Sequence, residues 1–147
     1  MAGEDKLTSK VRETGGRMTT QRRAVLEALA SVDTHPTAVE VYEIVRQTVP
    51  DVSQGTVYRN LRRLIELGYA QELDYGAGAA HFDACVEPHY HVRCTDCGRV
   101  ADLPLDSAPT PCIEEARRVA GRACAGWTIS EHRVEFMGLC PTCRKSE

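Results

Sequence analysis

The chain has few aromatic residues and no surplus of positive charge. Phe, Trp and Tyr make up 5% of its 147 residues, and the formal net charge is −3. A protein that coats nucleic acid through bulk charge needs a basic surface, so this balance excludes that class. Basic side chains form two local clusters, Arg17, Arg22 and Arg23, and Arg59, Arg62 and Arg63. These clusters can contact DNA or can simply be the solvated faces of helices.

Long apolar runs are also missing. No stretch approaches the roughly 20 apolar residues that span a bilayer, and residues 1–10 have no apolar core of the kind a signal peptide needs. We therefore expect a cytoplasmic protein without a membrane partner. Seven cysteines in a reducing compartment favour metal ligation over disulfides, and their odd number agrees with this interpretation.

The residue composition of the chain changes at about Cys85. Apolar residues recur at helical spacing before this point, whereas thiols, imidazoles and short alternating stretches follow it. A chain of this length can form one domain or two small ones. We expect an α+β protein with two domains, residues 1–83 and residues 84–147.

The first domain is predicted to be a winged helix-turn-helix. Periodicity predicts helices over residues 18–30, 38–48 and 53–67, with Thr37 and Ser53 as N-caps and Gly68 just past the third helix. Residues 69–74 and 80–83 are expected to form two strands around a glycine-rich turn. Three helices followed by a two-stranded ribbon are typical of winged helices.

In a winged helix the third helix enters the major groove of DNA, where outward side chains reach bases and phosphates. Many winged helices bind proteins instead, and Tyr58 can equally be a partly buried ring. The predicted contacts on this helix are Gln54, Thr56, Tyr58, Arg59 and Arg62.

The second domain is expected to be a small α/β domain. Strands are predicted over residues 89–93 and 99–103, a helix over 113–124, and a strand or long hairpin arm over 127–139. Its apolar residues are too few for a large core. We therefore expect it to need a bound zinc ion and a partner subunit.

Two Cys-x-x-Cys pairs are the strongest motif. They are Cys94 with Cys97 and Cys140 with Cys143. Each two-residue spacer lets a turn aim both sulfurs at one ion, and four thiolates saturate a tetrahedral zinc without leaving an open position. The pattern predicts a structural zinc site, because four unrelated cysteines would not show this paired spacing.

Histidines and carboxylates form a second candidate set. His89 and His91 are two residues apart on a predicted strand and so point to one face, and Asp102 lies on the strand expected to pair alongside. Asp83 and His35 complete the set, although each has a plain structural interpretation as a turn cap or a surface residue. Mixed nitrogen and oxygen ligands suit Fe(II), Mn(II) or Zn(II).

Together these residues resemble the ferric uptake regulator (Fur) family of bacterial metalloregulators along nearly the whole chain. The motifs that carry the resemblance are Arg17-Met-Thr-Thr-Gln-Arg22, His35-Pro-Thr-Ala38, Gly55-Thr-Val-Tyr-Arg59, His89-Tyr-His91 and both cysteine pairs. The resemblance implies a homodimer with an N-terminal winged helix and a C-terminal dimerisation domain. It also implies a palindromic operator, and we add Arg17, Gln21 and Arg22 to the predicted DNA contacts.

The resemblance further implies that His35, Asp83, His89, His91 and Asp102 bind a regulatory metal, Fe²⁺ or Mn²⁺. Aspartates at 83 and 102 are similar to the peroxide-sensing (PerR-like) branch, in which Fe(II)-catalysed oxidation of a ligand histidine releases DNA. His35 and His89 are the histidines implied. Plain iron, manganese or zinc uptake regulation is the alternative.

Pro88 and Tyr90 replace residues of a further metal site found in iron-sensing members, so we expect that site to be absent even though His132 remains. Cys85 raises the zinc-sensing alternative. We interpret Cys85, Cys112 and Cys124 as small core residues.

Two other classes of protein are alternatives. A zinc-dependent hydrolase can use a His/His/Asp site with an open position, but the chain has no nucleophile motif. A zinc-ribbon interaction module without a DNA role would be indifferent to polyanions and to salt, whereas a DNA-binding protein loses affinity steeply as the salt concentration rises. We expect a repressor and not an enzyme.

Overall fold

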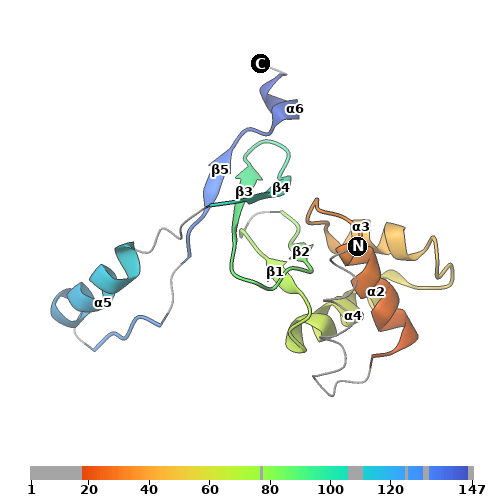
Figure 1. The fold of residues 1–147 in the computed structure, drawn as a ribbon, viewed down its shortest axis with the longest axis horizontal. Coiled ribbons are helices and arrows are strands. Elements are labelled where there is room, and N and C mark those ends of the chain that lie inside the picture. The colour runs from red at the N-terminus through yellow and green to blue at the C-terminus, as the bar shows by residue number, and fades with distance from the viewer. Residues whose placement is uncertain (1–17, 77, 106–110, 125, 131–132, 146–147) are drawn as a thin grey trace. The chain divides into compact units, whose positions relative to one another are not determined.

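The computed structural model describes residues 18–76, 78–105, 111–124, 126–130 and 133–145. The chain divides into two compact units, Met1–Glu87 and Pro88–Glu147, called here the front unit and the back unit. Both contain helices and strands, as the expected α+β class requires (Figure 1). Among the described residues, no helix combines the length and hydropathy needed to cross a membrane.

Three helices and a two-stranded ribbon make up the front unit. Helix α2 spans Thr20–Ala30, α3 spans Ala38–Val45 and α4 spans Gln54–Glu66. Strands β1 (Gln71–Leu73) and β2 (His81–Asp83) pair antiparallel, with Gln71 opposite Asp83. This order confirms the predicted succession of three helices and a ribbon.

The helix ends follow from capping residues that were visible in the sequence. Thr37 accepts from the backbone N–H of Glu40, whose carboxylate accepts from the N–H of Thr37, so α3 starts with a complete capping box. Gly68 has φ +76°, and Tyr69 N–H donates to the Leu64 carbonyl at 2.9 Å. Glycine adopts this left-handed conformation without a Cβ clash, which ends α4 as predicted.

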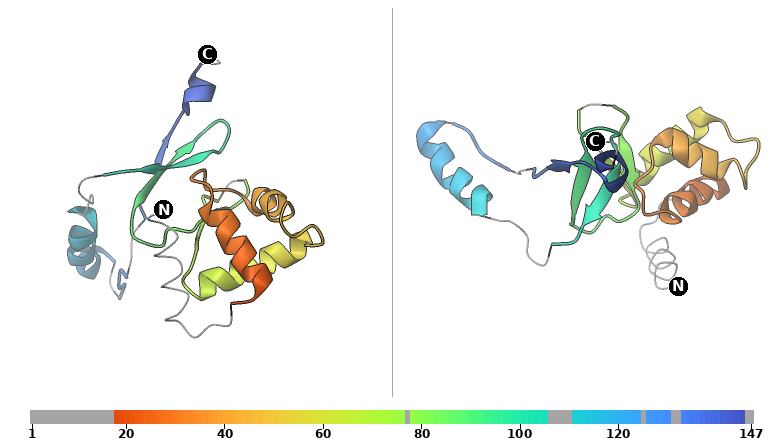
Figure 2. Two further views of the ribbon diagram at one scale, coloured as in Figure 1. Left: turned by 45° about the vertical axis from the view of Figure 1, so that its right-hand side comes forward. Right: turned by 90° about the horizontal axis from the view of Figure 1, so that it is seen from above.

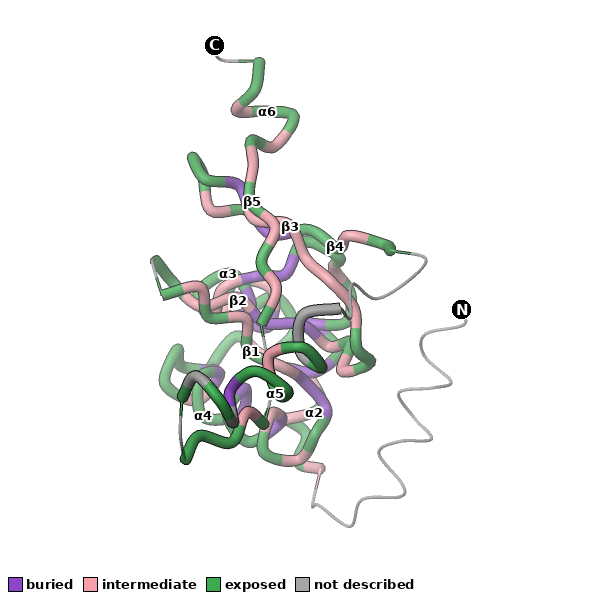
Figure 3. The backbone as a smooth tube through the Cα atoms, turned by 90° about the vertical axis from the view of Figure 1, so that its left-hand side faces the viewer, coloured by how far each residue is buried: buried purple, intermediate pink, exposed green. Residues whose placement is uncertain are grey.

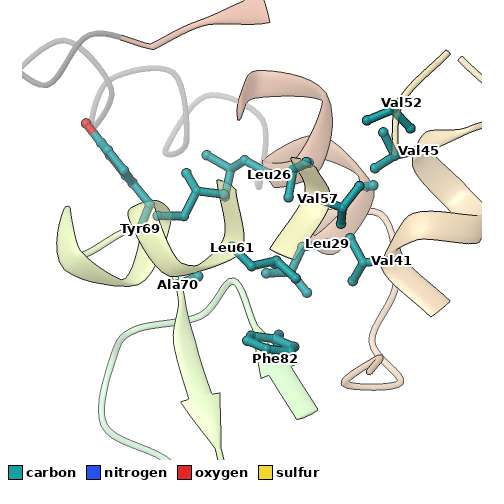
Figure 4. Packing of buried hydrophobic residues seen from close by; sticks show 13 residues of the cluster. Leu26, Leu29, Val41, Val45, Val52, Val57, Leu61, Tyr69, Ala70 and Phe82 are labelled. Carbon is teal, nitrogen blue, oxygen red and sulfur yellow. The ribbon is translucent and has the colours of Figure 1, made fainter. Parts of the chain in front are cut away.

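One apolar core holds the front unit together. The inner faces of the three helices meet there, and Phe82 on β2 points from the ribbon toward Leu61 and Leu29 (Figure 4). Phe82 is 2% exposed. Because strand residues alternate between faces, burial of Phe82 directs His81 and Asp83 to the other side of β2. The core therefore sets the face on which the functional residues of β2 lie.

The back unit is built on a three-stranded sheet with the order β4-β3-β5 (Figure 2). Central strand β3 (Tyr90–Cys94) pairs antiparallel with β4 (Val100–Leu103) and parallel with β5 (Phe136–Gly138). Helix α5 spans Pro111–Ala123, and the short helix α6 spans Pro141–Arg144. Helix α6 contains no buried residue (Figure 3).

The strand predicted over residues 127–139 is much shorter than expected. Among the residues of this range that the structure describes, only Phe136–Gly138 pairs, and residues 127–130 form no strand. The guanidinium of Arg117 donates to the carbonyls of Ile129 and Ser130 at 3.3 and 3.2 Å, so a side chain occupies acceptors that a strand would offer to a neighbour. Helix α6 was not predicted. His132 lies outside the described residues.

Candidate metal centres

The four predicted zinc ligands come together at one end of the sheet in the back unit. Cys94 ends β3, and Cys97 follows in the turn toward β4. Cys140 is the N-cap of α6, and Cys143 lies within this helix. Thr95 N–H donates to the Gly138 carbonyl at 2.8 Å, which ties the first turn to the end of β5. All four sulfurs lie within 4.8 Å of one another.

The thiol cluster fits a tetrahedral zinc ion. Zn–S bonds of about 2.3 Å place the sulfurs of a tetrahedral site about 3.8 Å apart, and the Cys97 and Cys140 sulfurs are separated by 3.7 Å. The backbone N–H of Cys140 donates to Cys94 Sγ at 3.3 Å. This donation, together with donation from the backbone of Cys97, lowers the pKa of Cys94 to about 6 and favours the thiolate form that zinc binds.

The other cysteines of the cluster have different surroundings. Donation from the backbone of Cys143 lowers the pKa of Cys140, whereas hydrogen bonding to the Asp96 side chain raises the pKa of Cys143. A thiol beside a carboxylate keeps its proton because the thiolate would face a like charge. Binding a positive ion among the four sulfurs removes this disadvantage, so we expect zinc uptake to release a proton.

Two of the predicted regulatory ligands meet in the front unit. His35 Nε2 lies 3.6 Å from Asp83 Oδ2, and their side chains are 3% and 10% exposed. Cys85 N–H donates to Asp83 Oδ1 at 2.7 Å, and Gln71 Nε2 donates to Asp83 Oδ2 at 3.3 Å. These bonds fix the carboxylate beside the ring. Gln71 was not singled out from the sequence, because its partner depends on the register of the ribbon.

The other three predicted regulatory ligands meet in the back unit. His91 on β3 is directly opposite Asp102 on β4. Asp102 Oδ1 lies 3.1 Å from His89 Nε2 and 3.5 Å from His91 Nε2. The two imidazole rings are in contact, with their centroids 4.3 Å apart. The predicted common face of His89 and His91 is therefore present.

These distances suit a first-row divalent cation. Nitrogen and oxygen ligands about 2.1 Å from an ion lie roughly 3.0 Å apart at right angles and 3.4 Å apart at tetrahedral angles. The measured separations are 3.6 Å in the front unit and 3.1 and 3.5 Å in the back unit. Imidazole and carboxylate donors suit Fe(II), Mn(II) and Zn(II), and do not suit copper(I).

The predicted DNA contacts lie at the surface of the front unit. Gln54, Tyr58, Arg59 and Arg62 on α4 are exposed, and Thr56 is half-buried. The guanidinium carbon of Arg62 lies 5.4 Å from the centre of the Tyr58 ring. Two further predicted contacts are on α2, where Gln21 is exposed and Arg22 half-buried, and Arg17 lies outside the described residues.

A hollow of about 310 Å³ adjoins the start of α4. Its lining includes Val39, which is 57% exposed, and Tyr58, which is 44% exposed. Sequence reasoning missed Val39, because an apolar residue in an amphipathic helix is normally assigned to the buried face. The exposed surface beside α4 is therefore partly apolar as well as basic.

The interpretation of the remaining cysteines as core residues was wrong where the structure describes them. Cys85 and Cys124 are exposed. Cys85 lies two residues beyond β2, after the chain has left the core, and Cys124 follows the end of α5. The side chain of Cys112 lies outside the described residues.

Comparison with known proteins agrees with this architecture. The sequence pattern of the ferric uptake regulator family matches residues 13–137. The peroxide operon regulator of Bacillus subtilis is 38% identical over 137 residues, which cover 93% of this chain and 90% of that protein. The chain therefore belongs to the ferric uptake regulator family.

Solved structures show the same relationship. The peroxide stress regulator of Campylobacter jejuni is 30% identical, with a TM-score of 0.61 over 84% of this chain and 88% of the other. A zinc-bound manganese uptake regulator is 25% identical, with a TM-score of 0.65 over 91% of this chain and 98% of the other. The chain is thus similar to peroxide regulators and to a metal uptake regulator.

Proposed function

We propose that this protein is a metal-dependent transcriptional repressor that releases its operator DNA in response to peroxide. The observation that carries this proposal is a histidine and aspartate donor set divided between two units. His35 and Asp83 belong to the unit that contains the winged-helix elements, whereas His89, His91 and Asp102 belong to the unit that contains the thiol cluster. Because the ligands come from both units, a bound metal ion can control DNA binding.

The structural metal is proposed to be zinc, bound by Cys94, Cys97, Cys140 and Cys143. The sulfur spacing and the amide donation to Cys94 support this assignment. Because four thiolates leave no open position, this zinc stabilises the back unit and takes no part in sensing.

The regulatory ion, Fe²⁺ or Mn²⁺, is proposed to bind all five histidine and aspartate ligands together. Such an ion binds fully only when the two units adopt one relative orientation, so it stabilises that orientation by its differential affinity. The carboxylate of Asp83 is already held by Gln71 and by the backbone of Cys85, which limits the reorganisation needed on binding. The ligands of the front unit therefore transmit metal occupancy to α4.

DNA binding is proposed to involve a homodimer on a palindromic operator. Exposed apolar side chains of the back unit support a subunit interface, namely Val119, Trp127, Met137 and Leu139. In a two-fold dimer, two α4 helices can enter successive major grooves, and Arg59 and Arg62 then approach phosphates or base edges. A repressor of this kind acts at bacterial DNA and therefore in the cytoplasm.

The peroxide response is proposed to arise at the regulatory ligands. A bound Fe(II) would activate hydrogen peroxide by giving it one electron and would regain one as a ligand histidine is oxidised, so that one peroxide oxygen is added to the imidazole and the other leaves as water. His35 and His89 are the proposed targets, because an oxidised imidazole at either position removes one ligand from the set. The aspartates at 83 and 102 and the similarity to peroxide regulators support this branch.

Mass spectrometry tests the proposed function. After a brief treatment with hydrogen peroxide, Fe(II)-loaded protein is expected to gain 16 Da, one oxygen atom, on a peptide containing His35 or His89, and to lose its DNA affinity. Mn(II)-loaded protein is the control and is expected to show neither change. Unmodified peptides with retained DNA binding in the Fe(II) sample would contradict peroxide sensing.

Plain metal uptake regulation is the second candidate. The likeness to a zinc-bound manganese uptake regulator favours it, because the same donor set binds a metal without needing peroxide. This candidate predicts metal-dependent DNA binding that persists after peroxide treatment. The same experiment therefore separates the two functions.

A further inference from the structure

His81 contacts the backbone of a proposed metal ligand. Its Nδ1 atom lies 2.6 Å from the carbonyl oxygen of His35, a residue 46 positions away in the chain. A carbonyl oxygen offers only lone pairs, so an imidazole nitrogen at this distance must carry the proton and donate it. His81 therefore donates a hydrogen bond to the peptide group between His35 and Pro36.

The segment that carries His35 is attached to the edge of β2. Phe82 N–H donates to the Pro36 carbonyl at 2.9 Å, and Thr37 forms an isolated bridge with His81. Strand β1 pairs with the opposite edge of β2, where Leu73 faces His81. The ribbon thus provides the surface on which the segment before α3 is held.

His35 needs such support because of its backbone. It has φ +51° and is the one non-glycine residue with positive φ in the described part of the chain. This conformation is uncommon for a residue with a Cβ and persists where the surroundings fix it. The direction of the His35 side chain follows directly from this backbone conformation, so contacts that hold the backbone also aim the imidazole.

We propose that His81 is a positioning residue for the regulatory metal site. Residues of β2 contact both the backbone and the side chain of His35. The ring of His81 donates to the His35 carbonyl, and Asp83 lies beside the His35 imidazole. His81 and Asp83 are two residues apart and share the face of β2 opposite Phe82. The inference rests on the proposed function, since the aim of His35 matters only if it ligates the ion.

Three substitutions separate positioning from simple packing. His81→Leu keeps the approximate size and removes the donor. In His81→Asn the side-chain NH2 group is bonded to Cγ, the atom to which Nδ1 is bonded in histidine. In His81→Gln the NH2 group is bonded to Cδ and so lies one bond further from the backbone. We expect Mn(II) affinity to fall at least about tenfold in His81→Leu and in His81→Gln, and to stay within about threefold in His81→Asn.

Mn(II) affinity is measured on the full zinc-loaded chain by titration calorimetry or by the electron paramagnetic resonance signal of free Mn(II). Circular dichroism reports folding, and His81→Gln replaces His81→Leu if the latter does not fold. Wild-type affinity in the leucine or glutamine variant would overturn the inference. Equal losses in the asparagine and leucine variants would overturn it too, because the retained donor would then have no effect.

Failure of the proposed function gives a different pattern. In that case the wild-type protein does not bind Mn(II), or His35→Ala binds Mn(II) as tightly as the wild type. Tight binding by the wild type, loss in His35→Ala and no loss in His81→Leu would overturn only the role of His81.

Discussion

His35→Ala is expected to lose metal-dependent DNA binding while retaining its zinc and its dimer. The substitution removes one of the two proposed ligands of the front unit, so an ion bound to the back unit no longer favours one orientation of α4. Coupling between sites is typically worth about 5- to 150-fold in affinity. DNA affinity in the presence of Mn(II) should therefore fall by a factor in this range, to the value of the metal-free protein.

Fluorescence anisotropy with a labelled operator fragment measures this loss, with and without Mn(II). Thr34→Ala is the matched control, because Thr34 is the exposed neighbour of His35 in the same loop. The control should keep the metal response of the wild type. A His35→Ala protein that still binds operator DNA only after Mn(II) is added would show that His35 is not a regulatory ligand.

Cys97→Ser is expected to release the zinc and to unfold the back unit. The main apolar core belongs to the front unit, and the buried hydrophobic residues of the described back unit are Cys94, Val100 and Ala120. Structural zinc contributes about 10–16 kcal/mol in small zinc-binding peptides. The small apolar core of the back unit cannot replace the free energy that zinc contributes. The variant should therefore become monomeric, while the front unit stays helical.

Zinc content by plasma mass spectrometry, subunit mass by light scattering and helicity by circular dichroism measure these effects. Cys124→Ser is the matched control, because this thiol is exposed and lies outside the four-cysteine cluster. It should keep one zinc per chain and remain a dimer. If Cys97→Ser also retains both, the thiol cluster is not what holds the back unit together.

The elements of the front unit could be predicted because local signals agree with the tertiary structure. Thr37 and Ser53 cap the helices whose apolar faces they precede, and Gly68 ends α4. Each signal acts within about four residues and so can be read from the chain alone. Four of the six helix ends shifted by one to three residues, and α2, for example, begins at Thr20 instead of Met18.

The back unit was harder to predict because its order depends on distant partners. Strand β5 pairs with β3 across more than 40 residues, and Arg117 on α5 binds the carbonyls of Ile129 and Ser130. Neither contact has a local signature. The alternating pattern over residues 127–139 thus suggested a longer strand than the three residues that pair.

The thiol cluster and the common face of His89 and His91 could be foreseen because chain spacing determines their geometry, whereas the place of His35 and Asp83 in the set was implied by the family resemblance. Cys-x-x-Cys turns aim two sulfurs together, and His89 and His91 share a face by strand alternation. The contacts of His81 and Gln71 could not be foreseen. Both depend on the register of the ribbon and on where the segment around His35 meets β2.

Anomalous diffraction from crystals of the Mn(II)-loaded dimer tests most directly whether one exchangeable ion joins the two units. We expect a manganese peak bound by His35 and Asp83 of the front unit together with His89, His91 and Asp102 of the back unit, separate from a zinc peak among the cysteines. A manganese ion bound by ligands of one unit alone would show that no exchangeable ion joins the two units.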